Sequence, residues 1–270
     1  MEETTYLLLA FLTYIVVMLS GFFSFFSQRK IFIRAYHLLS FLGLGFHSFS
    51  LIIRTFNSGH APFTNMYESI NFLAWACVLA VIIFERIFKL EKIGPYLWLL
   101  IVALMALISS PALPKNVTPL VPALQSYWLW LHVSVTLLGE AFLALAFVSS
   151  LFYLSASSRH KADPQNEKKK QKYDLIAYQA VAVGFPLFTL GALIFGMIWA
   201  NKAWGRYWGW DPKEVWSLIT WLFYAVYLHT RLVLGWSGKK SALIAIIGFL
   251  AALFTFFGVN YLLRGLHSYA

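Results

Sequence analysis

The chain has 270 residues, of which 60% are hydrophobic and 12% are charged, and its mean hydropathy is +0.69. This composition excludes an ordinary water-soluble domain, in which about a quarter of the residues are charged, and indicates an integral membrane protein. The formal net charge of +10 is explained mostly by the basic cytoplasmic loops of such a protein, so we do not expect nucleic-acid binding.

Apolar runs that reach the length needed to cross a bilayer, about 20 residues, recur along the whole chain. Because a backbone in lipid must satisfy its own hydrogen bonds, each continuous run predicts a helix. The predicted fold class is all-α: a polytopic membrane helix bundle with about eight transmembrane helices. The runs lie near 5–26, 31–54, 68–89, 93–110, 127–156, 175–200, 215–236 and 241–263.

The basic residues predict the orientation of these helices. Most of the 21 Lys and Arg residues fall in alternate loops, as in 29–34, 86–92 and 159–172, and such loops stay on the cytoplasmic side. Both termini and the loop at 201–214 are then external. The first run begins next to Met1 and lacks a small-residue cleavage site, so we expect a retained helix rather than a signal peptide.

Polar residues follow one face of the second run. Ser40, His47 and Arg54 recur every seven residues, which places them on the same side of a helix. In a membrane this face must point inward or toward a partner protein. The alternatives for His47 and Arg54 are hydrogen-bonded contacts between helices and direct contact with a bound ligand. Cys77, inside the third run, is expected to be a small buried residue.

One hydrophilic segment divides the runs. Residues 158–174 form a basic linker, predicted to be cytoplasmic, and a Lys-rich run of this kind is typical of a topology signal or an anionic-lipid contact. The linker separates an N-terminal five-helix half, 1–157, from a three-helix half, 175–270, that carries the external turn at 201–214. We expect the two halves to belong to a single integral membrane unit.

Two histidines are predicted near the external ends of helices. A proline-rich segment, 109–128, leads to His132, which lies close to the outer end of the fifth run. His267 follows the last run, on the same predicted side. Glu140, deeper in the fifth run, is the most buried-looking carboxylate and needs a partner; the alternatives are an external Arg or Lys and a neighbouring hydroxyl.

The external turn reads WGRYWGWDPKEVW, 204–216. Asp211, Pro212 and Glu214 fit the capping box that opens a helix. An aromatic belt at the membrane interface explains each indole alone but not their density, and Gly205 and Gly209 allow a flat partner to approach closely. Rigid aromatic faces with two flanking histidines suit haem, which imidazole binds axially; the alternative is an aromatic docking surface for a protein or a quinone.

The segment WANKAWGRYWGWDPKEVWSLITWLFYAVYLHTR, 199–231, resembles the tryptophan-rich "WWD" motif of haem-handling membrane proteins. Its DPKEVWSLITW and YLHTR forms are similar to the CcsA (ResC) family of system II cytochrome c biogenesis. Three other stretches also resemble this family: SGHAPFTNMYESINFLAW (58–75), LHVS (131–134) and GVNYLLRGLHSYA (258–270). The resemblance therefore covers most of the chain from the second run onward.

This resemblance implies the haem-handling subunit of a cytochrome c synthase, or haem lyase, that works with a CcsB (ResB)-type membrane protein. Such a subunit accepts haem b from the cytoplasmic side and presents it externally for thioether attachment to the CxxCH motif of apocytochrome c. His132 and His267 match the family's external iron ligands, to which the catalytic role is assigned, and His229 matches its transmembrane histidine. The cofactor-binding residues would further include Trp204, Arg206, Tyr207, Trp208, Trp210, Asp211 and Trp216.

Two other functions fit parts of the pattern. The first alternative is a haem exporter or relay without lyase activity, in which a different protein forms the thioethers. A quinone-binding membrane redox module, also rich in aromatic residues and histidine, is the second. The membrane would be the bacterial cytoplasmic membrane or the thylakoid membrane, with the Trp-rich turn on the external side.

Overall fold

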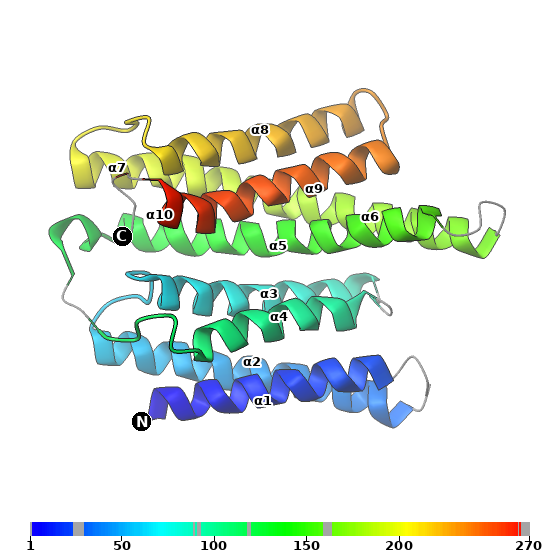
Figure 1. The fold of residues 1–270 in the computed structure, drawn as a ribbon, viewed down its shortest axis with the longest axis horizontal. Helices are drawn as coiled ribbons and strands as arrows, with labels where there is room; N and C mark the ends of the chain where they lie inside the picture. The colour runs from blue at the N-terminus through cyan, green and yellow to red at the C-terminus, as the bar shows by residue number, and fades with distance from the viewer. Residues whose placement is uncertain are drawn as a thin grey trace. The chain divides into compact units, whose positions relative to one another are not determined.

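A computed structural model describes residues 2–23, 30–88, 90, 93–117, 120–158, 164–263 and 265. Over these ranges every regular element is a helix (Figure 1), which confirms the predicted all-α fold. Contacts group the chain into two compact units, Met1–Leu120 and Val121–Ala270.

The first unit contains four long helices. They are α1 (Glu2–Phe23), α2 (Lys30–Ser58), α3 (Met66–Phe88) and α4 (Gly94–Ser109). Helix α1 packs against α2 and α4, and α3 packs against the same two helices. A Cβ atom on Gly43 would lie 2.6 Å from the Tyr14 ring, so the glycine allows α1 and α2 to approach closely.

The second unit is built around α5 (Tyr127–Ser158), which packs against α6 and α9. One continuous helical run comprises α6 (Pro164–Phe188), the π-helix η2 (Thr189–Phe195) and α7 (Gly196–Trp204). Helix α8 (Pro212–Leu232) packs against α9 (Lys239–Leu253), which continues through the π-helix η3 (Phe254–Gly258) into α10 (Val259–Leu262). The short 3-10 helix η1 (Pro122–Leu124) precedes α5 and contacts α7.

The helices agree with the predicted membrane spans. Six helical segments in the described ranges are long and apolar enough to cross a membrane. Helix α4 is apolar but shorter, and α8 carries more polar residues along its length. Helix α6 begins at Pro164, so much of the predicted linker at 158–174 is helical; the division into halves at this linker stays a prediction.

The polar face of α2 is buried, as its spacing predicted. Ser40, His47 and Arg54 are each at most 4% exposed. His47 donates from Nε2 to the Asn71 Oδ1 atom at 2.8 Å, because an amide oxygen can only accept, and Tyr14 donates its hydroxyl to His47 Nδ1 at 3.2 Å. This face therefore makes hydrogen-bonded contacts between helices. Cys77 is buried in α3, which confirms its predicted role.

Candidate functional site

The Trp-rich loop, residues 205–211, joins α7 to α8. Helix α7 ends at Gly205, whose left-handed φ of 73° suits a glycine C-cap. Helix α8 begins with the predicted capping box: the Lys213 amide donates to Asp211 Oδ2 at 3.1 Å, and the Asp211 amide donates to Glu214 Oε2 at 3.1 Å. Both ends of the loop are therefore fixed by local hydrogen bonds.

Trp210 has an unusual backbone conformation. Its φ is 57°, a left-handed value that costs a bulky residue about 1–3 kcal/mol. Glu214 Oε2 accepts the amide of Gly209 at 2.8 Å as well as that of Asp211 at 3.1 Å. One carboxylate thus binds the amides on both sides of Trp210. The side chain that this backbone presents is 70% exposed.

The aromatic residues in and beside the Trp-rich loop fall into an anchored set and an outward set. Trp204 packs edge-on against Trp199, with ring centroids 4.8 Å apart, and Trp216 packs on Phe254 at 4.2 Å. Trp208 meets Trp210 edge-to-face at 5.8 Å. Tyr207 and Trp210, at 59% and 70% exposed, point their rings outward.

Arg206 and Lys202 supply positive charge at this loop. Both side chains are exposed. The Arg206 guanidinium lies over Gly209, where a Cβ atom would come within 2.7 Å of Arg206 Nε. The guanidinium therefore stays beside the aromatic residues, in a position suited to an anionic group.

His132, near the start of α5, is held on two sides. Its Nδ1 atom lies 2.8 Å from the Gly191 carbonyl oxygen, and its ring stacks on Trp199 with centroids 5.6 Å apart and planes 9° apart. Because a carbonyl only accepts, Nδ1 carries the hydrogen, and in the neutral ring Nε2 then carries the lone pair that binds a metal. His132 is thus in the tautomer that an Nε2 ligand requires.

His229 lies far along α8 from the Trp-rich loop. His229 lies on α8, about 26 Å along the helix from Pro212, and its side chain is exposed. His267 lies outside the described residues. The chain approaches the Trp-rich loop at Gly265, where a Cβ atom would lie 2.5 Å from Asp211 Oδ1.

Two ionisable side chains, Lys213 and Glu140, interact near the start of α8. Lys213 donates from Nζ to Asn260 Oδ1 at 3.2 Å, which ties the start of α8 to α10. Glu140 on α5 is 6% exposed and interacts electrostatically with Lys213. Among the alternatives for Glu140, this neighbour favours a lysine, Lys213 at the start of α8, over a neighbouring hydroxyl.

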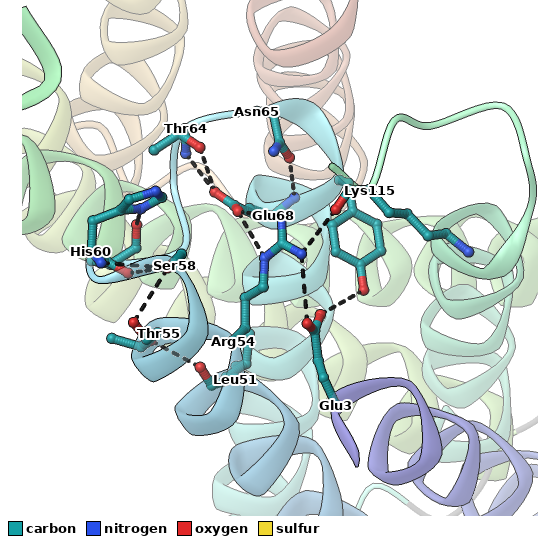
Figure 2. Close-up of polar contacts among 12 residues, drawn as sticks. Glu3, Leu51, Arg54, Thr55, Ser58, His60, Thr64, Asn65, Glu68 and Lys115 are labelled. Carbon is teal, nitrogen blue, oxygen red and sulfur yellow. Dashed lines mark hydrogen bonds and ion pairs between the residues drawn. The ribbon is translucent and has the colours of Figure 1, made fainter. Parts of the chain in front are cut away.

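In the first unit, Arg54 organises a separate polar network (Figure 2). Arg54 donates from Nε and Nη2 to Glu68 Oε1, at 2.9 and 2.7 Å, and from Nη1 to the Lys115 carbonyl at 2.9 Å. Glu68 Oε2 accepts the amide and hydroxyl of Thr64, and Glu3 Oε2 lies 3.5 Å from Arg54 Nη1. Because these contacts pin the loops at 58–66 and 110–117, Arg54 has a structural role.

His60 lies in the first of these loops, beside the Arg54 network (Figure 2). It is 5% exposed, and its Nδ1 atom donates to the Ala61 carbonyl at 3.0 Å. The Ser58 hydroxyl donates to the His60 carbonyl at 2.8 Å. These local bonds hold the His60 side chain and backbone within the loop.

Sequence reasoning missed the elements that hold His132. The π-helix η2 and the hydrogen bond from Trp199 Nε1 to the Ala123 carbonyl, at 2.9 Å, were not predicted. The available signal was the pair Gly191 and Gly196, since glycines inside an apolar helix often mark a close backbone contact.

Comparisons with family models and with known proteins point to the same family. A family described as "Cytochrome C assembly protein" matches residues 63–267. The "Cytochrome c biogenesis protein CcsA" of Chlamydomonas reinhardtii is 43% identical over 225 residues, which cover 81% of this chain but only 64% of that protein. The protein of the same name from Mesostigma viride is 35% identical over 287 residues, covering 94% and 92%.

A solved structure shares the fold. "Cytochrome c Heme Lyase CcmF" matches with a TM-score of 0.67 and 17% sequence identity, over 94% of this chain and 46% of that chain. At this identity the match establishes a common helical architecture.

Proposed function

This chain belongs to the CcsA group of cytochrome c assembly proteins, and we propose that it is the haem-handling subunit of a cytochrome c synthase. It accepts haem b from the cytoplasmic side and presents it externally to apocytochrome c. The observation that carries this proposal is the environment of His132: the bond from Nδ1 to Gly191 leaves Nε2 as the metal-binding atom beside a Trp-rich loop.

His132 and His267 are the proposed axial ligands at the external site. Two imidazoles close the coordination of the iron, and one of them can later yield to the histidine of the CxxCH motif. Among the described residues, the proximity of Gly265 to Asp211 supports this assignment, because it brings the chain to the loop two residues before His267.

The Trp-rich loop is proposed to bind the porphyrin. The exposed rings of Tyr207 and Trp210 offer flat apolar surfaces. Trp208 meets Trp210 edge-to-face, and we propose that Trp204 and Trp216 also contribute to the aromatic surface. Arg206, at the exposed rim, is suited to pair with a propionate. Asp211 contributes indirectly, because it caps α8 and thereby fixes the end of the loop.

The protein's share in thioether formation is positioning. Each cysteine of the CxxCH motif adds its S–H across a vinyl group, so that sulfur bonds one vinyl carbon and the hydrogen goes to the other. No other reagent is consumed. Holding the vinyl groups and thiols in place supplies most of what such a reaction needs from a protein, so the lyase activity belongs to the assembled synthase.

His229 supports a separate entry site that a partner completes. It lies on an exposed face of α8 with Leu222 and Val226, which are 49% and 48% exposed. An ionisable side chain is costly against lipid, so a partner surface is the better neighbour. We assign that surface to a CcsB (ResB)-type protein that supplies a second histidine, in a bacterial cytoplasmic or thylakoid membrane.

Haem content after purification with a co-expressed CcsB-type partner tests this function. Wild type is expected to show reduced bis-imidazole absorption bands and to mature a reporter cytochrome c. His132→Ala and His267→Ala should each lose or shift these bands and lower maturation by about tenfold or more. His37→Ala, at a half-buried histidine of α2, is the matched control and should retain both.

Haem bands and maturation that survive unchanged in both His132→Ala and His267→Ala would overturn the ligand assignment. Absence of haem from every sample, with the partner present, would overturn the haem-handling function itself.

A further inference from the structure

The helix that faces His132 changes its hydrogen bonding at that point. Along η2 the amide of Gly196 donates to the carbonyl of Gly191, five residues back, instead of four as in an α-helix. Such π-turns are rare and concentrate at functional sites. The change therefore needs a local explanation.

The π-turn places two glycines on the same side of the helix. In an α-helix, residues five apart point about 140° away from each other, since each turn takes 3.6 residues. A turn closed by an i→i+5 bond contains more residues, so positions five apart come to the same face of the helix. Gly191 and Gly196 consequently both face α5, where His132 lies.

Each glycine contacts α5 in a way that a larger residue would prevent. The Gly191 carbonyl accepts the His132 Nδ1 hydrogen at 2.8 Å, and a Cβ atom on Gly191 would collide with the Thr136 amide, one turn further along α5. A Cβ atom on Gly196 would lie 3.1 Å from both Cε1 and Nδ1 of His132. The backbone of η2 thus forms one wall of the space that the imidazole fills.

Trp199 forms the other wall. Its indole stacks on the imidazole with planes 9° apart. Its Nε1 atom donates to the Ala123 carbonyl in η1 at 2.9 Å, which fixes the indole in turn. The proline-rich segment before α5 therefore helps to hold the ring of His132.

We propose that η2, with Gly191, Gly196 and Trp199, is a positioning device for His132, which we call the His132 seat. The seat selects the tautomer with hydrogen on Nδ1 and holds Nε2 ready as a ligand. With respect to haem, this inference rests on the proposed function. There the hydrogen bond to Gly191 strengthens imidazole as an electron donor and so lowers the reduction potential of the iron.

Gly196→Ala is the most selective test, because the added methyl group meets the His132 ring and little else. In haem-free protein, 15N NMR of labelled histidine should show the Nδ1–H tautomer of His132 in wild type, assigned by its loss in His132→Ala. Gly196→Ala should shift this population toward the Nε2–H tautomer. In haem-loaded protein with its partner, the same substitution should raise the reduction potential.

Gly184→Ala is the matched control. It also crowds the contact between α5 and α6, since its Cβ atom would lie 2.9 Å from Leu143 Cδ2 and 3.0 Å from the Gly139 carbonyl, but it does not touch His132. We expect it to leave the tautomer and the potential unchanged. Trp199→Leu is the second variant, because it removes the stacking ring without adding an atom near the glycines, and it should act like Gly196→Ala.

If His132 were found as the Nε2–H tautomer in wild type, the proposed role of the His132 seat would be wrong. Equal changes in Gly184→Ala and Gly196→Ala would also contradict it, because they would reduce the effect to helix packing. In a haem-retaining His132→Ala background, Gly196→Ala should not change the reduction potential further. A shift as large as the one that Gly196→Ala causes in wild type would contradict the inference. If wild type bound no haem, the proposed function would fail. The tautomer measurement on haem-free protein would still test the role of the His132 seat.

Discussion

Helices α3 and α8 begin with the same kind of hydrogen bonding, but it has a different result in each. At each start a glutamate in the first helical turn accepts hydrogen bonds from the loop before it: Glu68 from the amide and hydroxyl of Thr64, and Glu214 from the amides of Gly209 and Asp211. Glu68 is fully buried and paired with Arg54. Glu214 instead holds Trp210 in a left-handed conformation with its indole exposed.

The difference is that Glu68 stabilises its loop, whereas Glu214 holds an aromatic side chain in an exposed position. Around Glu68, charged groups satisfy one another and the loop gains stability. Around Glu214, local bonding energy offsets a strained backbone, and the result is an aromatic ring directed outward. Strain held in place by surrounding structure is typical of functional sites, so the comparison supports the Trp-rich loop as the place where a ligand binds.

Loss of Glu68 should have the largest effect on stability. Glu68→Ala leaves the Arg54 guanidinium buried without its main partner, so we expect the free energy of unfolding to fall by about 3–5 kcal/mol. Thermal unfolding in detergent measures this. Replacing both residues, as Arg54→Met with Glu68→Leu, should recover much of the loss, and a double variant as unstable as Glu68→Ala would contradict the assignment.

Loss of Glu214 should destabilise the protein less but affect haem more. Glu214→Ala removes a capping-box side chain, which is worth about 0.5–2 kcal/mol, and releases the amides on both sides of Trp210. We expect haem content per folded protein to fall, while in Glu68→Ala it should follow the folded fraction. Absorbance at the haem bands divided by the folded fraction compares the two, and equal ratios would remove the distinction.

Relief of the strain at Trp210 should have the smallest effect on stability, and of opposite sign. Trp210→Gly allows the positive φ without steric cost, so the free energy of unfolding should rise by about 1 kcal/mol, while haem content falls because the exposed indole is lost. Trp210→Phe keeps both the strain and an aromatic ring, and serves as the control. A destabilised Trp210→Gly variant would show that the indole contributes more to packing than its exposure suggests.

Much of this organisation was predictable from local pattern. Continuous apolar runs indicated the helices, the seven-residue spacing of Ser40, His47 and Arg54 indicated a buried face, and Asp211 with Glu214 indicated a capping box. Each depends on residues close together in the sequence. The family resemblance then directed attention to His132.

Two of the missed features depend on contacts between distant segments, and two are local. The sequence LGALIFGM suits an ordinary apolar helix, and its π-turn is stabilised where Gly191 meets Thr136 and His132 of α5. The pairing of Arg54 with Glu68 depends on how the intervening loop folds. The positive φ of Trp210 was not foreseen because glycine is the residue expected there. The polar composition of 158–174 predicts a linker, but α6 begins within it, where Glu167 and Lys170 form an ion pair one turn apart.

The most direct test of the central claim is a change of ligand at His132. His132→Cys, purified with its partner and loaded with haem, should replace an imidazole by a thiolate, and electron paramagnetic resonance of the ferric protein distinguishes the two ligand sets. We predict a low-spin signal of the imidazole–thiolate type in place of the bis-imidazole signal. An unchanged bis-imidazole signal at full haem content would show that His132 does not bind the iron.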